Sequence, residues 1–290
     1  MVSFNVLSSG MGQWGYVVID QLLERAFPTI VITHNKSENP DLVVLSHFLG
    51  EEDLQFDCPY VTYSAEPYHV KPAIHDTPLC EVNTFDCDDS NCVYFPLLAA
   101  DSKSVRPESF ATDKKYCCAF AFTNPVKERE ALFRQLRTLE PTCYAFGSSC
   151  ATPDKPFELS RDNRFQNARA FRNFGFVVAM ENTVKAGYIT EKIGMAFESG
   201  TVPIYDSRNG VERFFNTESF FDVALYNSPV DAAVAAVEVW KDKQKLQRYL
   251  DAPIRVNGNL AEYENLEECK EARTWMMPFV RALREQFPDL

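Results

Sequence analysis

The sequence lacks any long apolar run. Its longest apolar stretches are short ones such as Phe174–Met180, whereas a helix that spans a bilayer needs about 18–20 apolar residues. The first residues, Met1–Leu7, have no basic region, no long apolar stretch and no small-residue cleavage site of the kind that marks a signal peptide. The sequence therefore predicts a soluble, cytoplasmic protein with no membrane span.

Basic residues are scarce relative to acidic ones. The 29 Lys and Arg residues face 41 Asp and Glu residues, which gives a formal net charge of −12. An acidic surface repels phosphate backbones and anionic lipid headgroups, so nucleic-acid binding and a polybasic membrane contact are not expected. A local basic pocket for one anionic ligand remains compatible with this balance.

The nine cysteines include no Cys-x-x-Cys pair, and the four histidines are scattered. This spacing does not predict a structural zinc site. An odd number of cysteines without an export signal favours reduced thiols. The acidic run Asp86–Asp89 contains an Asp-x-Asp pattern, which we interpret as a solvated loop rather than a metal site.

The sequence does contain alternating strand and helix patterns. At roughly 150 residues per domain, its 290 residues suggest two domains. Short β-branched runs alternate with amphipathic stretches, which predicts parallel βα units and an α/β fold. The expected strands are 2–7, 29–33, 41–46, 59–64, 116–122, 142–146, 176–180, 202–205 and 223–226, and the expected helices are 14–25, 125–139, 189–199, 229–242 and the C-terminal residues.

A polar stretch without periodicity, residues 101–113, is the best linker candidate. The expected organisation is a first domain at 1–105 and a second at 114–270. A C-terminal helix at 271–290 can cross back to the first domain. Ligands on open parallel sheets bind beyond the carboxyl ends of the strands.

The most informative segment is 176–205. A buried strand delivers Glu181 and Asn182 at its carboxyl end, and a helix then begins near Thr190 with Glu191 and Lys192 in its first turn. The free N–H groups and positive dipole end of such a helix form a natural anion site. Lys192 adds a full positive charge there. This layout predicts a nucleotide-sugar diphosphate site, although each of these residues alone would also fit an ordinary helix start.

This segment closely resembles the signature of the α-1,3/1,4-fucosyltransferases, glycosyltransferase family ten. The matching residues are Phe176, Glu181, Asn182, Gly187, Tyr188, Thr190, Glu191, Lys192, Ala196 and Val202–Tyr205. Upstream, Tyr116–Pro125 and the helix with Arg129 resemble the family's strand and the phosphate-contacting arginine that follows it. More weakly, Tyr60–Glu66 resembles a first-domain strand whose glutamate is the catalytic base.

The resemblance implies a GT-B arrangement, in which two Rossmann-like domains face each other across a cleft. The first domain would bind a glycan acceptor and the second GDP-fucose. The implied reaction is transfer of fucose with inversion, in α-1,3 linkage to N-acetylglucosamine or a related sugar. No cofactor is implied, and Mn²⁺ or Mg²⁺ is not expected to be essential. The oligomeric state is not indicated.

The resemblance also assigns roles to individual residues. Glu66 would be the base, although it also fits a surface loop carboxylate. Arg129, which alternatively is a solvated helix residue, and Lys192 would stabilise the leaving diphosphate. Asn182 and Tyr188 would donate hydrogen bonds, and Glu191 would bind sugar hydroxyls.

Two observations keep alternatives open. Asp206–Arg208 stands where the family often has Trp-Gly or Leu-Gly, so the same fold could serve another nucleotide sugar, or the chain could be an inactive binding relic. His69 and His75 flank the Glu66 loop. They fit either contacts with an acceptor or ordinary loop positions.

Overall fold

The computed structural model describes residues 1–9, 13–36, 38–48, 56–72, 77–97, 113–147, 149–159, 169–256, 263 and 273–290. The chain divides into two compact units, of which unit 1 comprises residues 1–100 and 260–290, and unit 2 residues 101–259. The sequence predicted a first domain at 1–105, a second at 114–270 and a C-terminal helix at 271–290. That the first domain binds an acceptor and the second GDP-fucose stays a prediction. Among the described residues, no helix has the length and apolar character required to cross a membrane.

Unit 1 is built on a six-stranded parallel sheet with strand order β2-β1-β3-β4-β5-β6. Its strands are β1 (Val2–Ser9), β2 (Ile30–Thr33), β3 (Leu42–Leu45), β4 (Tyr60–Ser64), β5 (Glu81–Asn83) and β6 (Cys92–Tyr94). Strands β3 and β4 are buried at every position, as expected for central strands of a parallel sheet that is covered on both faces.

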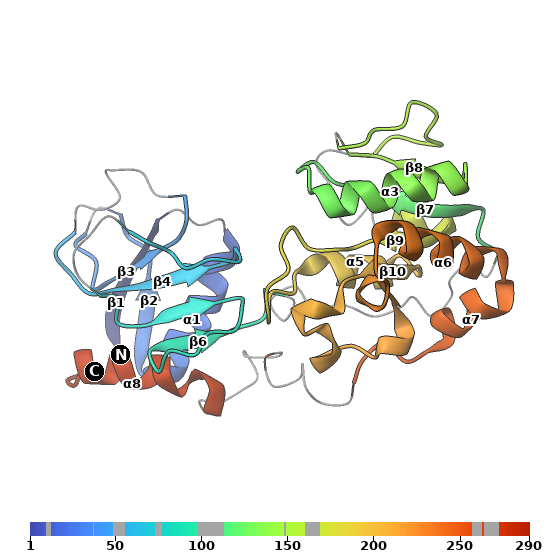
Figure 1. Cartoon of the computed structure of the whole chain (residues 1–290). Coiled ribbons are helices and arrows are strands. Elements are labelled where there is room, and N and C mark those ends of the chain that lie inside the picture. The colour runs from blue at the N-terminus through green and yellow to red at the C-terminus, as the bar shows by residue number, and fades with distance from the viewer. Residues whose placement is uncertain are drawn as a thin grey trace. The chain divides into compact units, whose positions relative to one another are not determined.

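The described part of unit 1 contains the α-helices α1 (Gln13–Ala26) and α8 (Met277–Gln286). They come from opposite ends of the sequence and pack together, and α8 also contacts β6 (Figure 1). Arg284 Nε donates a hydrogen bond to the carbonyl oxygen of Ala26 at 3.1 Å. The ring of Phe287 meets Phe4 edge-on at 5.2 Å. The C-terminal helix is therefore part of the core of unit 1.

Unit 2 is built on a five-stranded parallel sheet with strand order β11-β10-β9-β7-β8. Its elements are β7 (Tyr116–Phe120), α3 (Lys127–Leu139), β8 (Cys143–Ala145), β9 (Phe174–Val178), α5 (Glu191–Glu198), β10 (Val202–Tyr205), β11 (Phe221–Asp222), α6 (Pro229–Lys241) and α7 (Lys243–Asp251). Helices α3 and α6 pack against each other (Figure 1). They cover one face of the sheet together with α7. Helix α5 contacts β9 and β10, and the right-handed rule for crossovers between parallel strands puts it on the other face.

The order of strands in unit 2 reverses between β7 and β9, because β8 lies outside β7 on one side and β10 outside β9 on the other. The loops after β7 and β9 therefore diverge at this point. Such a reversal is where open parallel sheets bind ligands. Two Rossmann-like units confirm the α/β fold class that the sequence predicted.

Two sequence-based predictions are wrong in detail, and three elements were missed. The expected strand at 223–226 is a short 3₁₀ helix, Val223–Leu225, because the Asp222 side chain accepts a hydrogen bond from the N–H of Ala224. The thiols were expected to be reduced, but Cys87 and Cys92 form a disulfide with their Cα atoms 6.4 Å apart. Strands β5 and β6 and helix α7 were not predicted. The two strands have only three residues each, too few to show a pattern.

Candidate active site

Glu181 is the centre of a buried polar cluster just beyond the carboxyl end of β9. Its side chain is only 2% exposed. Its carboxylate accepts hydrogen bonds from the N–H of Thr190 at 2.8 Å, the hydroxyl of Tyr205 at 3.0 Å and the ammonium of Lys192 at 3.0 Å. The Thr190 hydroxyl adds a fourth contact at 2.8 Å. Glu181 thus ties β9 to β10 and to the beginning of α5.

The sequence placed Glu181 at the end of this strand but gave it no role. The signal that could have revealed one is the Glu-Asn pair directly after a buried strand. A carboxylate in that position must find several donors, because a buried and unpaired charge is very costly.

Lys192 lies in the first turn of α5, with a side chain that is 19% exposed. Burial disfavours its charged form, but the carboxylates of Glu181 and Glu191 outweigh burial and raise the pKa of Lys192 above its ordinary value. Lys192 also donates to the Thr190 hydroxyl at 2.8 Å. Within the described part of the chain, these bonds use two of its three N–H donors. The third can meet a ligand.

The beginning of α5 differs from the sequence-based expectation in one respect. The N–H of Thr190, expected to be free for an anion, is taken by the carboxylate of Glu181. Glu191, which was expected to bind sugar hydroxyls, is half-buried, and its Oε1 lies 3.8 Å from the Lys192 ammonium. The anion-binding capacity at this edge therefore rests on the cationic side chains more than on that N–H group.

Arg129, on α3, is fully buried at 0% exposure, which excludes the interpretation as a solvated helix residue. Its guanidinium donates to the carbonyl oxygen of Met180 and to Oδ1 of Asn182, both at 3.0 Å, and to the carbonyl oxygen of Asn124 at 2.9 Å. It lies 3.5 Å from the centre of the Phe122 ring. Arg129 therefore joins the loop after β7 to the loop after β9.

Burial lowers the pKa of Arg129 to about 10, and the nearby carboxylates of Glu181 and Glu130 oppose this shift. The group is still cationic near neutral pH. Its Nε–H is buried and has no hydrogen-bond partner among the described residues. The structure brings Arg129 and Asn182 into direct contact, but a contact between Arg129 and phosphate stays a prediction.

The loop between β9 and α5 is fixed by backbone contacts around Tyr188. Gly187 has a φ of +80°, a conformation that favours glycine. Its N–H donates to the carbonyl oxygen of Asn209 at 2.8 Å, and the Asn209 amide donates to the carbonyl oxygen of Tyr188 at 2.7 Å. Tyr188 is buried. The loop is therefore held in one conformation beside the Glu181 cluster.

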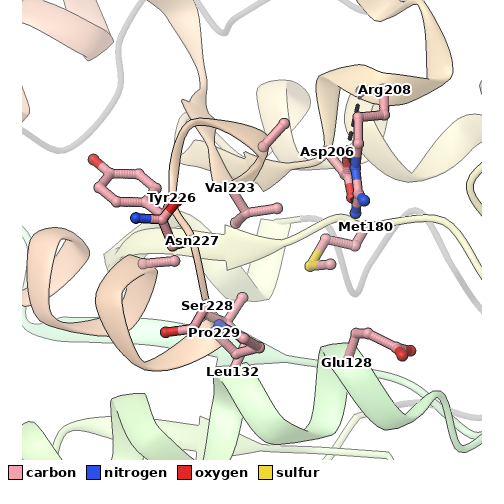
Figure 2. Close-up of a pocket in the computed structure, with 12 residues that line it drawn as sticks. Glu128, Leu132, Met180, Asp206, Arg208, Val223, Tyr226, Asn227, Ser228 and Pro229 are labelled. Atoms are coloured by element: carbon pink, nitrogen blue, oxygen red, sulfur yellow. Dashed lines mark hydrogen bonds and ion pairs between the residues drawn. The ribbon is translucent and has the colours of Figure 1, made fainter.

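A pocket of about 190 Å³ opens at the same edge of the unit 2 sheet, on the face covered by α3 and α6 (Figure 2). Met180, whose carbonyl oxygen binds Arg129, lies in its wall beside Glu128. Asp206 and Arg208 also line the pocket, next to Met180 in Figure 2, and Nε of Arg208 donates to the Asp206 carboxylate at 2.8 Å. Asp206 and Arg208, which depart from the family pattern, therefore line a pocket next to Arg129.

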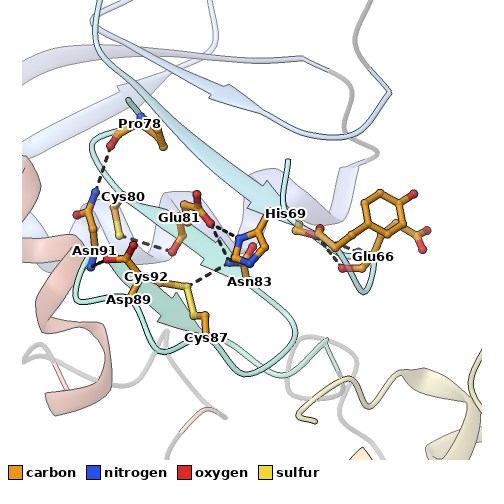
Figure 3. Close-up of polar contacts among 12 residues, drawn as sticks. Glu66, His69, Pro78, Cys80, Glu81, Asn83, Cys87, Asp89, Asn91 and Cys92 are labelled. Atoms are coloured by element: carbon orange, nitrogen blue, oxygen red, sulfur yellow. Dashed lines mark hydrogen bonds and ion pairs between the residues drawn. A yellow bond between two sulfur atoms is a disulfide. The ribbon is translucent and has the colours of Figure 1, made fainter. Parts of the chain in front are cut away.

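In unit 1, Glu66 is half-buried and lies two residues beyond the end of β4. The Ser64 hydroxyl lies 2.8 Å from the carbonyl oxygens of both Glu66 and Tyr68. His47 Nε2 lies 2.7 Å from the same hydroxyl. The turn that carries Glu66 is thus fixed, whereas its role as base stays a prediction (Figure 3).

The Asp-x-Asp pattern lies in the loop between β5 and β6. Asp89 accepts a hydrogen bond from the N–H of Asn91 at 2.9 Å, and Cys87, between the first two aspartates, is held in the disulfide. The pattern is thus part of a closed turn in unit 1. His75 lies outside the described residues.

Comparison with known proteins identifies the region that carries this cluster. Residues 111–273, more than half of the chain, match the model of the glycosyltransferase family 10 (fucosyltransferase) C-terminal region. The α-(1,3)-fucosyltransferase FucT of Helicobacter pylori is 24% identical over 229 residues, 75% of this chain and 44% of the relative. The chain therefore spans less than half the length of that relative.

A second relative is the human 4-galactosyl-N-acetylglucosaminide 3-α-L-fucosyltransferase 9, which is 32% identical over 96 residues, 32% of this chain and 27% of the relative. A crystal structure of an α1,3-fucosyltransferase with GDP-fucose superposes with a TM-score of 0.65 at 17% identity, covering 94% of each chain. At this identity the structural likeness shows the fold alone, which is that of GT-B glycosyltransferases.

Proposed function

Because the chain belongs to glycosyltransferase family 10 (fucosyltransferase), we propose that it transfers fucose from GDP-fucose to a sugar hydroxyl. The observation that supports this most is the cationic cluster of Arg129 and Lys192 at the carboxyl edge of unit 2, inside the region that the family model matches. The Helicobacter pylori relative is named an α-(1,3)-fucosyltransferase, and one solved structure of similar fold holds GDP-fucose.

The proposed donor site uses fixed positive charge. As the bond to fucose breaks, negative charge grows on the GDP diphosphate. Lys192 has an N–H donor left to meet a phosphate oxygen, and the buried charge of Arg129 stabilises the same anion at short range. Asn182 and Tyr188 add hydrogen bonds from the loop between β9 and α5, and Glu191 accepts from sugar hydroxyls. Since the positive charge comes from side chains, we propose that no metal ion is required.

The proposed acceptor step takes place at Glu66. A sugar hydroxyl is a poor nucleophile near neutral pH, so a base must accept its proton as it attacks. The acceptor oxygen bonds to the anomeric carbon, its proton passes to the Glu66 carboxylate, and the bond from the anomeric carbon to the diphosphate breaks. The electron pair of that bond leaves with GDP. Attack from the face opposite GDP inverts the anomeric carbon.

The human relative's name describes a 4-galactosyl-N-acetylglucosaminide acceptor. We propose the same class here, with fucose joined through an α-1,3 linkage to N-acetylglucosamine.

Donor binding is tested by thermal unfolding with GDP, GDP-fucose, GDP-mannose and uridine nucleotides, with and without EDTA. A ligand at about 100 times its Kd adds about 2.7 kcal/mol to the unfolding free energy, which raises Tm by several degrees. GDP and GDP-fucose should raise Tm equally well in EDTA. Lys192→Met should remove this shift, whereas Lys243→Met, at a 90% exposed side chain of the same unit, should keep it. A shift with uridine nucleotides alone would contradict the proposed donor.

The base is tested by Glu66→Gln, which keeps the shape of the side chain but cannot take a proton. Transfer should fall by about 10²-fold or more, with the Tm shift by GDP unchanged. Glu24→Gln replaces an exposed carboxylate on α1 of the same unit and should leave transfer intact. Transfer at the wild-type rate by Glu66→Gln would show that another group takes the proton.

A further inference from the structure

His69 is a partly exposed histidine in the same turn as Glu66, with a side chain that is 44% exposed. Its Nδ1 lies 2.6 Å from Oε2 of Glu81, on β5. Its ring meets Phe85 edge-on at 5.0 Å. Figure 3 shows His69 over β5, with its ring directed at Glu81 and Asn83. A carboxylate and an aromatic ring therefore fix both the position and the orientation of this imidazole.

The contact with Glu81 also determines which nitrogen carries the proton. A carboxylate can only accept a hydrogen bond, so the proton of the neutral imidazole lies on Nδ1 and the lone pair on Nε2. No described residue forms a hydrogen bond with Nε2. The exposed edge of the ring thus presents a hydrogen-bond acceptor that is not used by any residue the structure describes.

Glu81 is in turn fixed by a hydrogen bond from Asn83. The amide of Asn83, on the same face of β5, donates to Oε2 of Glu81 at 3.2 Å and to the sulfur of Cys92 at 3.1 Å. Asn83 is completely buried, and Cys92 is fixed by its disulfide to Cys87. This chain of contacts anchors the imidazole to two neighbouring strands.

The other described histidines show that this arrangement is particular to His69. His34 also pairs with a carboxylate, since its Nε2 lies 3.0 Å from Asp20, and its ring is similarly exposed at 37%. Its Nδ1, however, lies 2.9 Å from the carbonyl oxygen of Val6, so both ring nitrogens are engaged. His47 is directed at the Ser64 hydroxyl. Among the described histidines, His69 alone combines a carboxylate partner with a ring nitrogen that is unbonded and exposed.

Sugar hydroxyls are the ligand class that this arrangement fits. Each sugar hydroxyl can donate one hydrogen bond to an acceptor such as this nitrogen, and a pyranose ring carries several hydroxyls close together. The Ser64 hydroxyl fixes the carbonyl oxygens of Glu66 and of Tyr68, and Tyr68 directly precedes His69. One rigid turn therefore carries both the Glu66 carboxylate and the His69 imidazole. We propose that His69, oriented by Glu81, binds the acceptor sugar by accepting a hydrogen bond from a hydroxyl other than the one that attacks. This inference rests on the proposed function and extends it to a specificity-determining residue.

The test compares His69→Phe, which keeps the ring packing but removes the acceptor nitrogen, with the unsubstituted protein. The probe is a 4-galactosyl-N-acetylglucosaminide and its monodeoxy derivatives, with GDP-fucose as donor. The loss of one hydrogen bond should raise the acceptor KM about 10-fold while kcat, the KM for GDP-fucose and the Tm shift by GDP change little. Glu81→Gln should raise the acceptor KM in the same direction by a smaller factor, because it only orients the ring.

The deoxy acceptors give the sharper result. One of them should be a poorer acceptor for the unsubstituted protein, and for His69→Phe that same penalty should vanish, because the lost hydroxyl and the lost nitrogen are two halves of one contact. His34→Phe is the matched control and should retain the full penalty. If the deoxy acceptor carries the same penalty in His69→Phe as in the unsubstituted protein, His69 does not bind that hydroxyl. An equal rise of the acceptor KM in His34→Phe would likewise overturn the role of His69. Either result would leave the proposed function standing. Absence of any transfer by the unsubstituted protein would overturn the proposed function, and this inference with it.

Discussion

At the scale of single residues, the candidate donor site depends on a carboxylate, that of Glu181, to which the sequence assigned no role. Glu181 receives hydrogen bonds from β10, from α5 and from the residue before α5. It also balances part of the positive charge of Lys192 at 3.0 Å. The pair holds Lys192 in one place, so that its remaining donor is already positioned when an anionic ligand arrives.

Glu181→Gln should destabilise unit 2 strongly. The change leaves the Lys192 ammonium buried without its counter-charge and puts an amide donor among groups that themselves donate. Breaking a buried ion pair in this way typically costs about 3–5 kcal/mol. Glu191→Gln, at a half-buried neighbour 3.8 Å from the same ammonium, should cost far less. Urea denaturation of both variants measures the difference, and equal losses would show that Glu181 has no special structural role.

Stability should also decline at alkaline pH because of this cluster. Glu181 and Glu191 raise the pKa of Lys192 above 10.5 in spite of burial, and burial together with Glu181 raises the pKa of Tyr205 above 10.0. The folded protein therefore holds both protons more tightly than the unfolded chain does. The stabilisation is complete at a pH below the pKa values of the unfolded chain. It is lost as the pH rises through the higher pKa values of the folded protein.

The free energy of unfolding should thus fall above about pH 10, and Tyr205→Phe should show a smaller decline. Denaturation curves at a series of pH values measure both slopes. A stability that stays constant through this alkaline range would contradict the assigned environment of these groups.

At the scale of elements, the sequence predicted most of unit 2 because its strands are apolar and its helices are clearly bounded. Strand β10 has the expected bounds, and β9 and α5 differ from them by about two residues. The prediction failed where a local contact overrides the pattern. The apolar residues from Val223 onward look like a strand, but the Asp222 side chain turns them into a 3₁₀ helix.

The turn after β8 offers a test of close packing between elements. A Cβ on Gly147 would lie 1.9 Å from the carbonyl oxygen of Phe122, in the loop after β7. Backbone cannot move aside as a flexible side chain can, so Gly147→Ala must push the two loops apart. We expect a loss of about 1–3 kcal/mol in unfolding free energy, measured by urea denaturation. A stability within about 0.5 kcal/mol of the unsubstituted protein would show that the loops are not in close contact.

At the scale of the whole molecule, the sequence predicted two Rossmann-like units and the strand ends that meet at the candidate site. The resemblance to the family assigned Arg129 and Asn182 to one donor site, and the structure shows a hydrogen bond between them. The His69–Glu81 pair was not foreseen, because β5 is too short to be recognised and its partner is twelve residues away in sequence. Residues that come together only through the pairing of strands, such as His69 and Glu81, can be identified only from the folded structure.

The most direct test of the central claim is to incubate the chain with GDP-fucose and a 4-galactosyl-N-acetylglucosaminide in EDTA, and to analyse the products by mass spectrometry and NMR. The expected result is one fucose added per GDP released, with an anomeric configuration opposite to that of the donor and a rate that EDTA does not change. A protein that binds GDP but releases no GDP from GDP-fucose, or one that consumes only another nucleotide sugar, would contradict the proposed fucosyltransferase activity.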